Sequence, residues 1–133
     1  GVTTSETPIL TIHNKEIFQG KENRVTIKLI LVTASAEGTK PSTIRIRKGA
    51  LLDSANYNDI ETAVSVIEFD EAATGLVNGD DQLGIGVGRS GSEVLDLDTK
   101  SYFLRPGEFF TISGKASQGT IDGVISINWE ELH

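Results

Sequence analysis

Short runs in which apolar and polar residues alternate constrain this chain more than any other feature. The segment 43–47 reads Thr-Ile-Arg-Ile-Arg, so an extended strand here carries two isoleucines on one side and two arginines on the other. Near the end of the chain, Gly123, Ile125, Ile127 and Trp129 alternate with polar residues in the same way. A period of two is typical of β-strands with one buried face, and no stretch of ten residues carries the apolar stripe of a helix.

A third clear strand is expected over residues 25–32, which read VTIKLILV. Its first half alternates, and the pattern predicts one inward face made of Val25, Ile27, Leu29 and Leu31. Ile30 and Val32 make the opposite face apolar as well. A strand with two apolar faces is typical of a position that is covered on both sides.

Weaker strands are expected between these three, separated by turn signals such as Pro106-Gly107. They cover residues 9–12, 63–69, 82–87, 94–97, 101–104 and 109–113. Strands at this spacing in a chain of 133 residues predict one all-β domain. We expect a jelly-roll-like antiparallel β-sandwich of about eight strands over residues 8–133. Residues 1–7 are polar and form a short N-terminal arm, either frayed or ordered against a neighbouring subunit.

Charge and composition exclude several classes of protein. The net charge of −7 argues against binding to nucleic acid, which requires Lys and Arg to neutralise phosphates. The chain has no cysteine, which excludes disulfides and thiolate chemistry. No apolar run approaches the roughly 20 residues of a membrane-spanning helix, and the polar start does not resemble a signal peptide. We therefore expect no nucleic-acid partner and no membrane partner.

Catalytic motifs are not recognisable, and we expect the protein not to be an enzyme. The glycines of segment 86–91 fit the G-x-G-x-x-G pattern, but the strand-turn-helix setting that this motif needs is not predicted. His13 and His133 lie at opposite ends of the chain, without the spacing of metal ligands. Carboxylates occur in loops such as 78–81 and could contribute oxygen ligands to a calcium ion, but neither the number nor the spacing completes a site. No cofactor and no metal are expected.

Aromatic residues are concentrated late in the chain and are the candidate interface. Two pairs of neighbours must point to opposite faces of their strands, so one member of each can fill the core while the other faces a second layer, solvent or a partner. The open alternatives are an outer face covered by a loop, a contact between subunits, and a platform for sugar rings. The candidate residues are Tyr102, Phe103, Phe109, Phe110 and Trp129.

The last third of the chain carries a distinctive series of strand ends and turns. One strand ends in Leu-x-Pro-Gly-Glu (104–108), the following strand closes in small residues (109–116), and a final strand ends in Glu131-Leu132. This pattern resembles the ends of small structural proteins of tailed-bacteriophage virions. It implies a capsid decoration or cement protein, or a fibre domain, located in the virion after assembly in the host cytoplasm. It also implies a homotrimer that binds the major capsid protein or another virion protein.

The alternative is a carbohydrate-binding or receptor-binding module. In that case Tyr102, Phe103 or Trp129 would stack on the rings of a glycan, as exposed aromatic side chains do in such modules.

Overall fold

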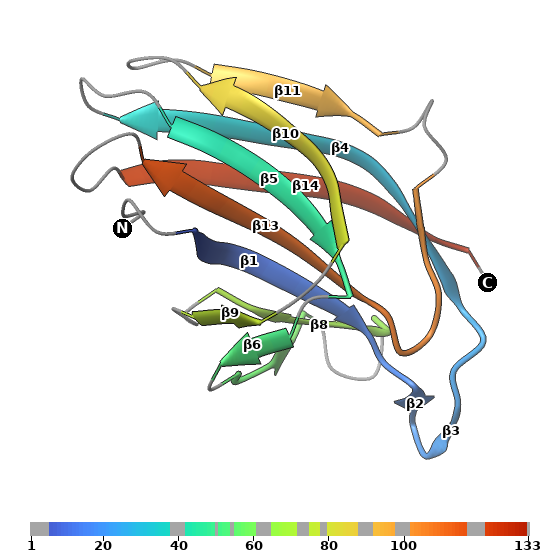
Figure 1. The fold of residues 1–133 in the computed structure, drawn as a ribbon. Coiled ribbons are helices and arrows are strands. Elements are labelled where there is room, and N and C mark those ends of the chain that lie inside the picture. Colours follow the sequence, from blue (N-terminus) through green and yellow to red (C-terminus); the bar gives the residue numbers. More distant parts are fainter. Residues whose placement is uncertain are drawn as a thin grey trace.

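A β-sandwich without helices is formed by the described part of the chain (Figure 1). The computed structural model describes residues 6–37, 42–49, 51–53, 55–60, 65–71, 75–77, 80–87, 92–97, 102–116 and 122–132. Eight of the strands have four or more residues, and the shorter ones form turns and edges. The predicted all-β sandwich is confirmed.

The larger sheet has six antiparallel strands, in the order β10-β5-β13-β1-β8-β7. Their bounds are Asp80–Val87 (β10), Ser42–Lys48 (β5), Phe109–Ala116 (β13), Thr7–Asn14 (β1), Ile67–Asp70 (β8) and Asn58–Asp59 (β7).

The smaller sheet is centred on β4, which pairs with β14 along one edge and with β11 and then β12 along the other. A short hairpin, β2-β3, and a two-stranded sheet formed by β6 and β9 lie outside both sheets. The bounds are Thr26–Glu37 (β4), Asp122–Leu132 (β14), Ser92–Asp96 (β11), Phe103–Leu104 (β12), Ile17–Phe18 (β2), Lys21–Glu22 (β3), Leu51–Asp53 (β6) and Gly75–Val77 (β9).

Consecutive strands cross from one sheet to the other at β4-β5, β10-β11, β12-β13 and β13-β14. Three of these pairs, β4-β5, β10-β11 and β13-β14, follow the same lateral order in both layers: β10-β5-β13 in one sheet and β11-β4-β14 in the other. This crossing is the jelly-roll-like feature of the fold. It also leaves the larger sheet wider than the smaller one, because β1, β8 and β7 continue past the position of β14 (Figure 1).

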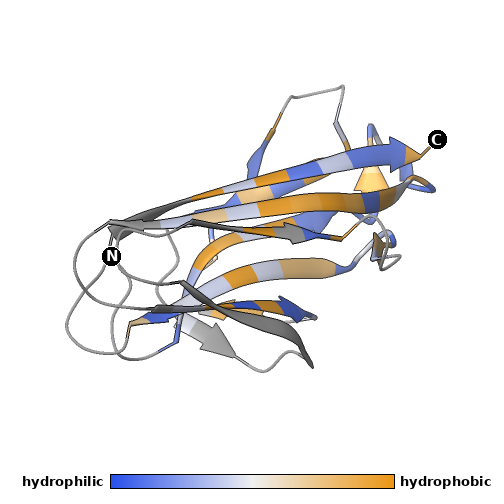
Figure 2. Cartoon of the chain, turned by 90° about the horizontal axis from the view of Figure 1, so that it is seen from above, coloured by the Kyte–Doolittle hydropathy of each residue, from blue (hydrophilic) through white to orange (hydrophobic). Residues whose placement is uncertain are grey.

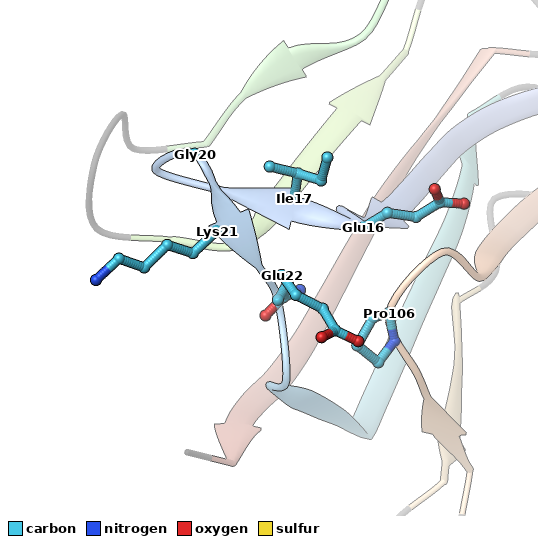
Figure 3. Close-up of a pocket in the computed structure, with 7 residues that line it drawn as sticks. Glu16, Ile17, Gly20, Lys21, Glu22 and Pro106 are labelled. Carbon is cyan, nitrogen blue, oxygen red and sulfur yellow. The ribbon is translucent and has the colours of Figure 1, made fainter.

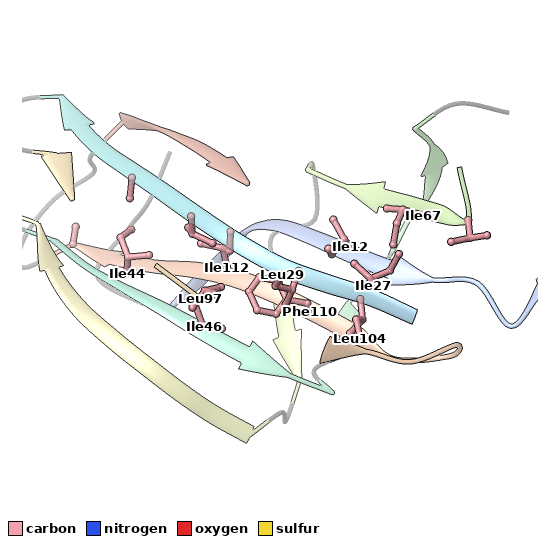
Figure 4. Packing of buried hydrophobic residues seen from close by; sticks show 14 residues of the cluster. Ile12, Ile27, Leu29, Ile44, Ile46, Ile67, Leu97, Leu104, Phe110 and Ile112 are labelled. Atoms are coloured by element: carbon pink, nitrogen blue, oxygen red, sulfur yellow. The ribbon is translucent and has the colours of Figure 1, made fainter. Parts of the chain in front are cut away.

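The core fills the space between the sheets and follows the alternation of the sequence (Figures 2 and 4). On β5, Ile44 and Ile46 are buried whereas Arg45 and Arg47 are only partly covered, as predicted. On β14, the alternating residues Ile125, Ile127 and Trp129 all pack against the core, also as predicted. The buried apolar residues are Ile12, Ile27, Leu29, Val32, Ala34, Ile44, Ile46, Val66, Ile67, Leu97, Leu104, Phe110, Ile112 and Ala116.

Strand β4 departs from the sequence prediction. Ile27 and Leu29 are buried, but the next buried residues are Val32 and Ala34 instead of Leu31. The pairing with β14 steps from Leu29 directly to Leu31, so the residue between them is the extra residue of a β-bulge. Beyond the bulge, the residues that face the core are therefore shifted by one position along the strand. The apolar run on both faces of this strand therefore reflects a change of face and not a second covering layer.

Two buried asparagines connect the segments that meet at one end of the sandwich. The Asn14 side-chain nitrogen donates hydrogen bonds to the carbonyl oxygens of Val25 and Leu104, at 2.8 and 2.9 Å. The Asn23 side-chain nitrogen donates to the Asn14 Oδ1 at 2.7 Å and to the Lys15 carbonyl at 2.6 Å. Every polar atom of a buried amide needs a partner, so this network fixes the end of β1 against the start of β4 and the end of β12.

The Pro106-Gly107 turn closes against the same network. Glu108 donates its backbone N–H to the Arg105 carbonyl at 3.0 Å, which is the hydrogen bond of a β-turn. Gly107 has a φ of 88°, a conformation that suits glycine, and its N–H donates to the Asn14 carbonyl at 2.6 Å. The turn that the sequence predicted is thus present, and it is anchored on β1.

Asn14→Asp should lower the free energy of unfolding by at least about 3 kcal/mol, because it removes a donor shared by two carbonyls and buries a carboxylate against them. Urea denaturation at neutral pH measures the loss. The control is Asn58→Asp at an exposed position, which should change the free energy of unfolding by no more than about 0.5 kcal/mol. Equal effects of the two substitutions would contradict the role of the network.

The N-terminal end of the domain is held by an ion pair. Strand β1 begins at Thr7, and the Glu6 carboxylate accepts hydrogen bonds from the Arg47 Nη2 at 2.7 Å and from Arg47 Nε. The Ser113 hydroxyl donates to the same carboxylate at 2.9 Å. The hydrogen bond from Arg47 holds the pKa of Glu6 below its ordinary value, although partial burial opposes the shift. Residues 6 and 7 of the expected arm therefore belong to the domain, and residues 1–5 lie outside the described residues.

Glu6→Gln should destabilise the domain by about 1 kcal/mol at pH 7, because the charged acceptor of the Arg47 guanidinium is lost at a partly solvated site. The pKa of Glu6 is lowered on folding, so its contribution is present above the unfolded pKa and disappears as the pH falls through the folded pKa. The difference between the wild type and the variant should therefore shrink in acid, as measured by denaturation between pH 7 and pH 3. Glu71→Gln, at an exposed carboxylate, is the control.

Candidate interaction surface

The structure separates the five aromatic residues of the candidate interface. Phe110 is 2% exposed and lies in the core, whereas its neighbour Phe109 faces the outer side of the larger sheet. Tyr102 and Trp129 are half-buried and pack against the core. Phe103 is 38% exposed on the outer side of the smaller sheet. Neighbours do point to opposite faces, as strand geometry requires, but the five side chains do not form one surface.

The outer face of the smaller sheet is built from rows of residues that pair across β4. In one row Phe103 and Glu130 flank Lys28, and in another Val94 and Ser126 flank Thr33. Paired residues in antiparallel strands point to the same side, and the buried neighbours Ile27, Leu29, Val32 and Ala34 mark the opposite side as the core. We call this surface the small-sheet face. Its described side chains are Lys28, Leu31, Thr33, Val94, Asp96, Phe103, Ser126, Asn128, Glu130 and Leu132.

Apolar side chains are unusually exposed on the small-sheet face. Val94 is 62% exposed, and Phe103 and Leu132 are each 38% exposed. They are half of the large apolar side chains that are exposed in the described part of the chain. Polar groups lie among them, both neutral ones such as the Ser126 and Thr33 hydroxyls, which hydrogen-bond to each other, and the charged side chains of Lys28, Asp96 and Glu130. A sheet face that combines exposed apolar and polar side chains is suited to contact with another protein.

Contacts between the two sheets hold Phe103 in place. The Lys48 ammonium, on β5 of the larger sheet, donates to the Phe103 carbonyl at 2.9 Å and forms an ion pair with Glu108 at 3.2 Å. Sequence reasoning named Phe103 but missed Val94 and Leu132 as surface residues. Their exposure depends on the pairing register with β4, which no local pattern reveals.

A second group of rings lies on the outer face of the larger sheet. The His13 and Phe109 rings are stacked, with centroids 4.1 Å apart and planes inclined by 11°, and Tyr57 lies 5.7 and 5.8 Å from the two. His13 Nδ1 is 2.7 Å from the Glu68 carboxylate. Sequence reasoning treated His13 as isolated, since its partners lie far along the chain and Tyr57 belongs to a segment without a clear pattern.

The protonation state of Tyr57 limits the chemistry that the cluster of His13, Tyr57 and Phe109 can perform. Burial, together with the negative charges of Asp70 and Glu68, raises the pKa of the Tyr57 hydroxyl to about 12. The phenol is therefore a neutral hydrogen-bond donor at physiological pH. Within the described residues, no group of three or more His, Asp or Glu side chains is arranged to hold a metal ion.

A shallow pocket of about 460 Å³ opens beside the β2-β3 hairpin (Figure 3). Glu16, Ile17, Lys21 and Glu22 line it on the hairpin side, and Pro106 closes it on the other. The carboxylates and the lysine are of mixed charge, and Ile17 is 65% exposed. The pocket offers no convergent set of groups for one kind of ligand.

Comparison with known proteins gives no relative. No protein-family profile matches the chain, and neither the curated proteins nor the solved structures contain a significant match. The helix-free described region also contains no long apolar helix of the kind that crosses a membrane.

Tyr57 should titrate at about pH 12 in the folded protein, about two units above a tyrosine in the unfolded chain. Ultraviolet absorbance of the phenolate measures the titration, and Tyr57→Phe should remove this late step. Because the pKa is raised on folding, the stability linked to this group is complete below pH 10 and is lost as the pH rises toward 12. The phenylalanine variant should therefore lose less stability than the wild type over that interval.

Proposed function

We propose that this protein is a virion structural protein of the capsid decoration type, which binds the phage head through the small-sheet face. The observation that carries the proposal is the exposure of Val94, Phe103 and Leu132 on one sheet face that no described strand covers. The virion assignment rests on the resemblance of residues 101–132 to the ends of such proteins. The partner is the major capsid protein or another virion protein, and the expected assembly is a homotrimer on the virion surface.

Burial of apolar surface would supply the binding free energy. A specific protein contact covers about 800 Å² on each partner, and a few central side chains supply most of its affinity. Phe103 is suited to such a central role, because its backbone is fixed by Lys48 while its ring faces solvent. Many weak contacts repeated over an icosahedral shell add up through multivalency, so each one can be modest.

The proposal predicts that Phe103→Ala weakens binding to capsids by at least about tenfold, the loss of a typical interface anchor. Capsids purified without their decoration protein serve as the probe, and co-sedimentation measures binding. Ile17→Ala is the matched control, since it removes an even more exposed apolar side chain on the β2-β3 hairpin. Thermal melting of both variants verifies that they fold. Undiminished capsid binding by Phe103→Ala would refute the small-sheet face as the contact.

A carbohydrate-binding or receptor-binding module is the second candidate. Phe103 supports it, because an exposed ring in the same cross-strand row as Lys28 and Glu130 combines a stacking surface with polar groups. The same variants distinguish the two functions. Binding to immobilised glycans that is lost in Phe103→Ala, without binding to capsids, would favour this candidate over the decoration protein.

A further inference from the structure

Residues 55–60 form a strap at the edge of the larger sheet, and little apolar surface holds it in place. Five of its six side chains are exposed, and only Tyr57 is half-buried. The described core includes none of the six. The strand within the strap, β7, is two residues long and is the last strand of the sheet. A segment with so few buried apolar contacts can open locally while the rest of the domain stays folded.

Tyr57 carries the strap across β8 to the ring pair of His13 and Phe109. β7 lies beside β8 at the edge of the sheet, whereas His13 and Phe109 belong to β1 and β13, farther in. The Tyr57 ring nevertheless lies 5.7 Å from the His13 ring and 5.8 Å from the Phe109 ring, centroid to centroid. The closed strap therefore covers one side of this ring pair, and an open strap uncovers it.

Two aspartates tie the strap to the sheet. The Asn56 backbone N–H donates to the Asp70 Oδ2 at 2.5 Å, and Asp70 is 3% exposed. Asp59, on the strap itself, forms an ion pair with Lys15, which follows β1. A carboxylate is a stronger hydrogen-bond acceptor when it is ionised, and an ion pair requires both charges. Both ties therefore depend on the negative charge of an aspartate.

The remaining titratable groups at the strap set the direction of its response to acid. Glu68 lies opposite Asp59 in the β7-β8 pairing and contacts the His13 Nδ1. Near neutral pH, carboxylates therefore face the basic side chains of His13 and Lys15. At about pH 3 carboxylates are mostly protonated, whereas His13 and Lys15 are both positively charged. Tyr57, whose pKa is raised to about 12, stays neutral throughout this range.

We propose that the strap is a pH-sensitive cover, closed over the ring pair of His13 and Phe109 near neutral pH and released in acid. Acid weakens the two ties without removing any core contact, so the strap opens before the two sheets separate. Opening uncovers the ring pair on the outer face of the larger sheet, on the side of the sandwich away from the small-sheet face. The inference uses the contacts of residues 55–60 and is independent of the virion assignment.

Amide hydrogen exchange tests the release residue by residue. The strap amides that report on it are Asn56, bonded to Asp70, and Ile60, whose N–H donates to the Ile67 carbonyl at 3.3 Å. Protection factors correct for the pH dependence of exchange itself. For the strap amides they should fall by at least about tenfold from pH 7 to about pH 3, because a hydrogen bond to a charged acceptor and an ion pair are both weakened.

Reference amides in the two sheets separate local release from global destabilisation. Asn14 donates to the Glu108 carbonyl at 3.1 Å, and Leu29 donates to the Tyr102 carbonyl at 2.9 Å. Both reference amides should lose much less protection in acid than the strap amides. An equal loss at the strap and reference amides would mean that the whole domain is destabilised, and would overturn the proposal.

Removal of single charges at pH 7 provides the matched test. Asp59→Asn should lower the protection of the strap amides about threefold, as expected for one partly exposed ion pair. Glu130→Gln, at an exposed carboxylate opposite Lys28 on the smaller sheet, is the control and should leave them unchanged. Asp59→Asn combined with Asp70→Asn should make the strap amides nearly insensitive to acid. If the substitution at the buried Asp70 prevents folding, Asp59→Asn at its exposed site decides alone. The proposal fails if the control acts as strongly as Asp59→Asn, or if the double variant responds to acid like the wild type.

Discussion

The buried hydrogen bonds of Asn14 and Asn23 are the constraint on which one end of the sandwich depends. They bring the end of β1, the start of β4 and the end of β12 to a common point. An amide side chain can serve this purpose because it both donates and accepts. The β2-β3 hairpin and the Pro106-Gly107 turn both begin at this network. The network also positions Phe103, because β12 ends there.

Strand alternation made much of this fold predictable, and the exceptions have a physical cause. Over residues 43–47 and 125–129 one face is buried and one is not, so the pattern is unambiguous. In β4 the run VTIKLILV is equally compatible with two covered faces and with a bulge at Ile30, since both place apolar residues on successive positions. Only the partner strand decides between them. Pairing over a long distance along the chain is the information that a local pattern lacks.

The candidate surface was predictable to a smaller extent for the same reason. Strand geometry required Phe109 and Phe110 to diverge, but not which of them would enter the core. Val94 and Leu132 are ordinary strand residues until their rows across β4 are known. The contact of His13 with Glu68 depends on the pairing of β1 with β8, which places the two residues directly opposite each other although they are far apart in the chain. Which side chains meet on the surface of this fold therefore depends on the pairing register of the strands.

The order in which strands join β4 has a consequence for how the chain folds. Its partner along one whole edge is the C-terminal strand, with Thr26 opposite Leu132. Contacts between residues so far apart close slowly, because the loss of chain entropy precedes the gain from pairing. β4 can therefore complete its pairing only once β14 has been made. A fragment that ends before β14 leaves one whole edge of β4 unpaired and lacks Ile125, Ile127 and Trp129, which pack against the core, so this domain is expected to fold only when β14 is present.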